Sequence, residues 1–107
     1  VGRNCLVCMN SVLMDHVQIG DESIVGALTF IKEGAIIPPR SLVAGNPGKI
    51  IRAVSEEQLK WKTEGTRLYQ QLPVYCKNEL KKCQPLRKTK KQTPLRSFHY
   101  KTWKSKP

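Results

Sequence analysis

The residues best suited to bind a ligand stand together between positions 45 and 52, in the order Gly-Asn-Pro-Gly-Lys-Ile-Ile-Arg. The two glycines let a ligand approach the backbone, and the two basic side chains can meet phosphate oxygens. The candidate cofactor-binding residues are therefore Gly45, Asn46, Gly48, Lys49 and Arg52. The alternative is that Gly45 and Pro47 only turn the chain, since turn residues need no ligand.

Histidine is too scarce for a catalytic metal centre. An open catalytic zinc site takes three histidines and a water, and this chain has only His16 and His99. His16 follows Asp15 in the middle of a repeat, which favours a corner or surface residue over a metal ligand. We therefore assign no metal ligand and no catalytic residue, and we expect the chain to bind zinc poorly.

The spacing of the four cysteines does not indicate a disulfide framework. Cys5 and Cys8 have the C-x-x-C spacing of zinc and redox sites, but no second such pair accompanies them. Cys76 and Cys83 would lie about 10 Å apart along a helix, which is too far for a disulfide. No apolar run approaches the roughly 18 residues of a membrane span. Free thiols fit a reducing compartment, so we expect a cytoplasmic protein with no membrane partner.

The net charge of +11 belongs to one end of the chain. Residues 1–75 carry 8 basic and 7 acidic side chains (net +1), whereas residues 76–107 carry 11 basic side chains against Glu79 alone (net +10). Basic side chains neutralise phosphates, and the interleaved Phe98, Tyr100 and Trp103 can stack on unpaired bases. Charge runs of this kind commonly stay solvated. We therefore expect a disordered tail rather than a nucleic-acid partner.

The candidate ligand residues come at the end of a six-residue repeat. Aliphatic residues recur at every sixth position without a gap: Val1, Val7, Leu13, Ile19, Val25, Ile31, Ile37 and Val43. A period of six fits neither a helix nor simple strand alternation, but it fits short strands bent at regular corners. We expect the aliphatic residue and the small residue two places before it to point inward. Glycine at Gly2, Gly20 and Gly26 should ease the corners.

The repeat should end at the prolines and glycines of residues 38–48, because proline removes backbone donors from a sheet. A helix should then begin at Ser55-Glu56-Glu57-Gln58, which has the form of a capping box. The expected domains are the coils at 1–48, a linker and helical segment at 49–85, and the basic tail at 86–107.

The expected helix carries a largely apolar stripe that should pack on an outer face of the coils. Its members are Leu59, Lys62, Tyr69, Leu72, Cys76, Leu80 and Cys83. Gly65 should weaken this helix, and Pro73 should kink or split it.

The repeat resembles the hexapeptide-repeat transferase superfamily, in which three hexads complete one coil of a left-handed parallel β-helix. A closer resemblance is to its gamma-carbonic-anhydrase-like branch, in the C-terminal half of the carnitine operon and phenylacetic acid degradation proteins. It rests on residues 1–4, 9–15, 19–27, 55–62, 65–66 and 69–70. The resemblance implies a mainly β fold: a left-handed parallel β-helix, truncated at its N-terminus, followed by a C-terminal α-helix and a basic tail.

The same resemblance implies a homotrimer that acts in acyl-coenzyme A metabolism. In the superfamily, the segment that matches residues 45–52 often approaches coenzyme A, and Met9 and Asn10 match a segment near the pocket wall. Full-length relatives hold zinc or a similar divalent metal between subunits. Because the matching histidines would precede Val1, no metal is expected in this chain.

Two functions remain open from the sequence. The first is the C-terminal part of a trimeric protein acting on coenzyme A thioesters of carnitine or phenylacetate type, like a transferase or thioester hydrolase and inactive as this chain alone. The second is a non-enzymatic β-helix platform whose basic tail binds nucleic acid or an acidic partner. The segment-by-segment match favours the first, and a tail that orders on RNA or DNA would favour the second.

Overall fold

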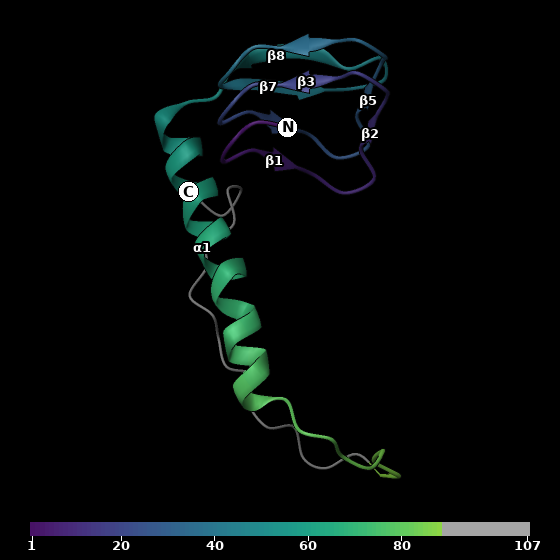
Figure 1. Cartoon of the computed structure of the whole chain (residues 1–107), viewed down its shortest axis with the longest axis vertical. Coiled ribbons are helices and arrows are strands. Elements are labelled where there is room, and N and C mark those ends of the chain that lie inside the picture. Colours follow the sequence, from purple (N-terminus) through teal and green to yellow (C-terminus); the bar gives the residue numbers. More distant parts are fainter. Residues whose placement is uncertain (89–107) are drawn as a thin grey trace. The chain divides into compact units, whose positions relative to one another are not determined.

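A computed structural model describes residues 1–88 of the chain, which divides into two compact units at Thr63 and Glu64. The fold is mainly β with one C-terminal helix (Figure 1). The strands are β1 (Leu6–Val7), β2 (Val12–Leu13), β3 (Gln18–Ile19), β4 (Ile24–Val25), β5 (Phe30–Ile31), β6 (Ile36–Ile37), β7 (Ser41–Ala44) and β8 (Lys49–Ala53). Helix α1 (Glu56–Glu79) begins in the first unit and ends in the second.

The strands of the first unit stack as coils of 18 residues, or three hexads. Strands β1, β4 and β7 pair in parallel in one sheet, β2 pairs with β5 in a second, and β3 with β6 in a third. Leu6 pairs with Ile24, and Ile24 pairs with Leu42, so each residue lies beside the one 18 positions later. Three short strands per coil give a three-sided parallel β-helix, which is why the sequence has a period of six.

The interior of the coils holds the residues that the repeat predicted. Ile19, Val25, Ile31, Ile37 and Val43 are 0 to 8% exposed and form one cluster. Ser23, Thr29 and Ser41, from the small-residue positions, are also buried. Short side chains fit beside the aliphatic column because the three sheets converge at each corner.

The corners do not use glycine as the sequence analysis expected. Positive φ angles recur at every sixth residue, at Asn4, Asn10, His16, Glu22, Leu28, Gly34 and Arg40, and only one of these is glycine. Backbone bonds between successive coils hold the corners: the Glu22 N–H donates to the Arg3 carbonyl (2.8 Å) and the Arg40 N–H to the Asp21 carbonyl (2.8 Å). Gly20 is needed for a different reason, because a Cβ there would lie 2.3 Å from the backbone nitrogen of Pro39. Glycine permits close stacking of coils, and it does not supply the left-handed turn.

Strand β8 was not anticipated from the sequence. It runs antiparallel to β7, with a β-bulge near Leu42 and Val43, in a stretch that was expected to be a linker. The Val54 N–H, just after β8, still donates to the Arg40 carbonyl (2.7 Å). Because β8 folds back beside β7, it occupies the edge on which a further parallel strand would pair.

The capping box predicted at Ser55 is present at the start of α1. The Gln58 N–H donates to the Ser55 hydroxyl (3.2 Å), and the Ser55 N–H donates to Gln58 Oε1 (3.4 Å). The helix then continues to Glu79, so the expectation that Pro73 splits it is wrong. Proline removes only its own N–H bond, and the carbonyl it leaves free belongs to an exposed turn that water can reach. Within residues 1–88, no helix is long and apolar enough to cross a membrane.

The first two turns of α1 lie along the edge formed by Asn4, Glu22 and Arg40. Arg40 Nη2 pairs with Glu56 Oε1 (2.5 Å), and the Asn4 side-chain amide donates to Thr63 Oγ1 (3.1 Å). Seven helical residues rise about 10 Å, which matches the rise of two coils at about 4.8 Å each. The helix can therefore contact the first and third coils at once.

Lys62 is the most deeply buried cation on this edge, at 4% exposed. Its Nζ donates to Asn4 Oδ1. Burial lowers the pKa of this ammonium, because desolvation disfavours the charged form. The first part of α1 therefore packs on the coils, but along a corner edge and through polar side chains, whereas an apolar stripe on an outer face was expected. The stripe residues after Thr63 belong to the second unit, and their expected packing stays a prediction.

Removing the hydroxyl of Thr29 should stabilise the coils. Its Oγ1 is buried without a hydrogen-bond partner, whereas the Ser23 hydroxyl donates to the Pro38 carbonyl (3.1 Å) and accepts from the Ser41 N–H (3.2 Å). Thr29→Val should raise the free energy of unfolding by about 1 kcal/mol or more, and Ser23→Ala should lower it by about 1 to 3 kcal/mol. Urea unfolding followed by circular dichroism measures both. Equal destabilisation by the two variants would contradict this reading of Thr29.

Candidate ligand-binding edge

The turn from Gly45 to Gly48 joins β7 to β8 and rests on the start of β5. Gly45 has a φ of +100°, and the Asn46–Pro47 peptide is cis. The Phe30 N–H donates to the Gly45 carbonyl (3.0 Å), and the Gly48 N–H donates back to the Phe30 carbonyl (2.7 Å). A Cβ on Gly48 would lie 2.9 Å from that carbonyl oxygen. The backbone of the turn therefore explains both glycines without a ligand, while residues 45–47 stay exposed to solvent.

Stacking of the coils places this turn above Met9 and Asn10. The corner between β1 and β2 carries Met9 and Asn10, and the Leu28 N–H, at the corresponding corner of the next coil, donates to the Met9 carbonyl (3.1 Å). The turn at 45–47 takes the same place one coil further, since β7 stacks on β4 and Gly48 bonds to Phe30. We call this row of residues 9–10, 27–28 and 45–47 the ligand edge. Its ends are about 10 Å apart, or two coil rises.

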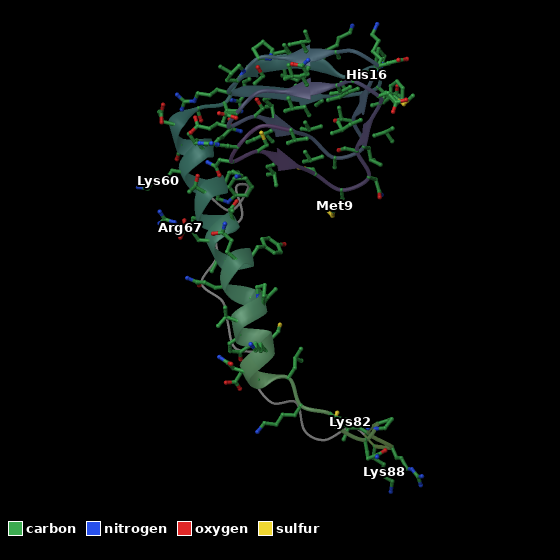
Figure 2. The ribbon with its side chains drawn as sticks, viewed as in Figure 1. Met9, His16, Lys60, Arg67, Lys82 and Lys88 are labelled. Atoms are coloured by element: carbon green, nitrogen blue, oxygen red, sulfur yellow. The ribbon has the colours of Figure 1, made fainter. Side chains whose placement is uncertain are left out.

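The surface of the ligand edge is apolar and accessible. Met9 is 80% exposed and Leu28 is 70% exposed. Figure 2 shows the Met9 side chain pointing away from the ribbon. Leu28 was missed in the sequence analysis, although counting 18 residues back from Asn46 leads to it. The structure therefore brings the expected pocket wall and the expected cofactor turn to one edge and adds a leucine between them.

Lys49 and Arg52 face outward on β8, but their surroundings differ. Lys49 pairs with Ala44, Arg52 with Leu42, and Ile50 with the fully buried Val43, so the two cations lie on the outer face of the sheet. Arg52 Nη1 donates to Gln58 Oε1 (2.6 Å) and to the Ala53 carbonyl (3.2 Å). Lys49 makes no such contact within residues 1–88 and directly follows the turn. Lys49 is available to an anionic ligand, whereas Arg52 stabilises the start of α1.

The residues weighed as metal ligands lie elsewhere. His16 is an exposed corner residue on another edge of the coil, beside Gly34, which confirms the corner interpretation (Figure 2). Among residues 1–88, no group of three or more histidine, cysteine, aspartate or glutamate side chains could hold a metal ion. All four cysteines are free, and burial raises the pKa of the Cys8 thiol. His99 and most of the expected disordered tail lie outside the described residues.

The chemistry available on the ligand edge is that of binding. It combines apolar side chains, the amides of Asn10 and Asn46 and an exposed turn, and the charge of Lys49 lies beside it, directly after that turn. These groups suit an elongated ligand with an apolar part and an anionic part. Within residues 1–88, no histidine, cysteine, aspartate or glutamate belongs to this row, so its residues can hold a ligand but supply no strong nucleophile or general base.

Comparison with known proteins identifies the repeat. Residues 1–33 match the family described as bacterial transferase hexapeptide (six repeats). The carnitine operon protein CaiE of Salmonella agona (strain SL483) is 42% identical over 94 residues, which cover 88% of this chain and 48% of that protein. CaiE of Escherichia coli (strain K12) is 44% identical over 94 residues with the same coverage. The chain spans about half the length of the curated relatives it matches.

Solved structures agree with this assignment. A hexapeptide transferase family protein from Anaplasma phagocytophilum aligns with a TM-score of 0.64 and 26% identity, over 74% of this chain and 46% of that one. A Bacillus cereus protein provisionally named an acetyltransferase aligns with a TM-score of 0.69 and 30% identity, over 71% of this chain and 44% of that one.

The different surroundings of the two cations on β8 predict different effects of their removal. Arg52→Ala should lower the free energy of unfolding by about 1 kcal/mol, because Gln58 Oε1 loses a charged donor. Lys49→Ala should change it by less than about 0.5 kcal/mol, as for most surface substitutions. Urea unfolding of both variants measures the difference. A larger loss in Lys49→Ala than in Arg52→Ala would show that the turn, not the helix cap, depends on these charges.

Proposed function

Because this chain is a homologue of the carnitine operon protein CaiE and carries a transferase hexapeptide repeat, we propose that it forms part of a protein of acyl-coenzyme A metabolism. The protein belongs, in this proposal, to the carnitine type within the gamma-carbonic-anhydrase-like branch. Its coils are left-handed, and it works in the cytoplasm as a homotrimer. The role of the described chain is to bind the coenzyme A thioester along the ligand edge.

The observation that carries this proposal is the meeting of Met9, Asn10 and the 45–48 turn on one edge. Residues far apart in the sequence gather there only because coils of 18 residues stack. Coenzyme A thioesters are long, with phosphates at one end and an apolar chain at the other. Lys49 can meet a phosphate as a point charge, and Met9 and Leu28 offer apolar surface to the acyl-bearing arm.

A homotrimer agrees with the apolar side chains left on the outside of the coils. Val12 on β2, Met14 just after it, and Ile36 on β6 are all exposed. Exposed apolar surface of this kind often marks a protein interface. Association of three chains through these faces would cover them, and it would place a second chain beside the ligand edge.

The residues described in this chain do not fit the zinc site of full-length relatives. Such a site needs three histidines, and residues 1–88 contain only His16, on a different edge. We derive no catalytic step through a metal. What this chain's own residues do is bind and orient: Lys49 holds a phosphate, and the apolar edge holds the chain that bears the thioester.

Binding of acetyl-coenzyme A tests the proposal by isothermal titration calorimetry. The whole chain should bind it, and Lys49→Ala should weaken binding by about 5- to 20-fold, because one charge-assisted contact to phosphate is lost. Lys32→Ala is the matched control, since Lys32 is an exposed lysine of the coil that is not part of the ligand edge. It should leave the affinity unchanged.

Leu28→Ser extends the test to the apolar part of the edge. It should weaken binding of long-chain acyl-coenzyme A more than binding of free coenzyme A, because only the former places apolar atoms there. Absence of binding, or equal losses in the Lys49 and Lys32 variants, would contradict the proposed site.

A further inference from the structure

The proposed function assigns no role to the basic side chains of the second unit. Five of them lie in the described part, at the end of α1 and just after it: Lys77, Lys81, Lys82, Arg87 and Lys88. All five are exposed, and Glu79 is the one acid among them. We call these five residues the cation strip; Figure 2 labels Lys82 and Lys88 on it.

The cation strip differs from the buried or bonded cations of the first unit. Arg40 pairs with Glu22 and Glu56, and Lys62 donates to Asn4. In the described part of the chain, no member of the strip makes an ion pair or side-chain hydrogen bond. Five cations in twelve residues repel one another, and only Lys77, in the last turn of α1, lies where a cation favours the helix dipole. Such a surface gains favourable free energy only when a polyanion approaches it.

The sequence after the strip continues the same charge and adds aromatic residues. Residues 76–107 hold 11 basic side chains, so 11 − 5 = 6 follow Lys88, and no acid follows Glu79. Phe98, Tyr100 and Trp103 stand among these later cations. Basic residues interleaved with aromatic ones match the chemistry of a single nucleic-acid strand, whose phosphates need cations and whose bases stack on rings.

The backbone of the strip favours a single strand over a duplex. Reading the base edges of a duplex in its major groove requires a helix or a two-stranded ribbon. Only Lys77 lies on α1, and residues 80–88 have no helix or strand. We propose that the cation strip binds single-stranded nucleic acid, which departs from the expectation, drawn above from the sequence, that the tail has no nucleic-acid partner. This goes beyond the proposed acyl-coenzyme A function and uses none of its residues.

The salt dependence of oligonucleotide binding tests this proposal. The probe is a fluorescein-labelled 20-nucleotide oligothymidine, followed by fluorescence anisotropy with the whole chain at a series of KCl concentrations. Each phosphate contact to a single strand contributes about −0.7 to the slope of log K against log salt concentration. Changing Lys77, Lys81, Lys82, Arg87 and Lys88 together to Ala should therefore make the slope shallower by about 3.5 if all five meet phosphates.

Two further variants distinguish the effect of the strip's charge on binding from the effects of other exposed lysines and of aromatic stacking. The double variant Lys32→Ala, Lys60→Ala removes two exposed lysines of the first unit and should leave affinity and slope unchanged. Trp103→Ala should weaken binding about fivefold or more without changing the slope, since stacking carries no counterion release. Alanine favours helix, so far-UV circular dichroism should show α1 intact in the five-residue variant.

Three outcomes would overturn the proposal: no binding of oligothymidine at low salt, an unchanged slope in the five-residue variant, or tighter binding to a duplex of equal length, to polyglutamate or to phosphatidylserine vesicles. The two proposals fail separately. Acetyl-coenzyme A binding that survives in the five-residue variant belongs to the ligand edge, and oligothymidine binding that survives Lys49→Ala belongs to the strip.

Discussion

Stacking of one 18-residue coil on the next is the constraint on which the rest of this structure depends. Each corner turns through a positive φ angle, and each corner from Glu22 to Arg40 is held by a backbone bond to the corner of the coil before it. Non-glycine residues accept this conformation because the stacked neighbours fix it. Gly20 lies where two coils come closest, and a side chain there would separate them. Residues 18 apart in the sequence thereby become neighbours in space.

The same stacking gives two edges of the coil different roles. The edge of Asn4, Glu22 and Arg40 is polar and receives the first two turns of α1, whose rise matches two coils. The ligand edge exposes the apolar side chains of Met9 and Leu28 and ends in the 45–48 turn. Strand β8 links the two edges, because it starts at the turn and its Arg52 bonds to the cap of α1.

The sequence predicted the features that follow from periodicity, and it missed the features that depend on tertiary contacts. From Ile19 onward, the aliphatic residue of each hexad is buried, and the capping box at Ser55 starts α1 as expected. The sequence did not predict the positive φ angles at the corners, because residues such as Leu28 adopt them only where stacked coils fix the backbone. Strand β8 was missed because its pairing is antiparallel and bulged, with no repeat to signal it. Arg52 was assigned to the ligand site from its charge and its place after the turn. Its hydrogen bond to Gln58 joins a strand to a helix cap, which spacing along the chain does not reveal.

The central claim is that stacking assembles a binding edge for a coenzyme A thioester from residues of three successive coils. The most direct measurement is a two-dimensional amide NMR spectrum of isotope-labelled protein, recorded as acetyl-coenzyme A is added. The account predicts that the largest shift changes fall on Asn10, Leu28 and Lys49 together, while Asn4 and Glu22 on the helix-bearing edge barely move. Changes confined to the second unit, or spread equally over both edges, would contradict it.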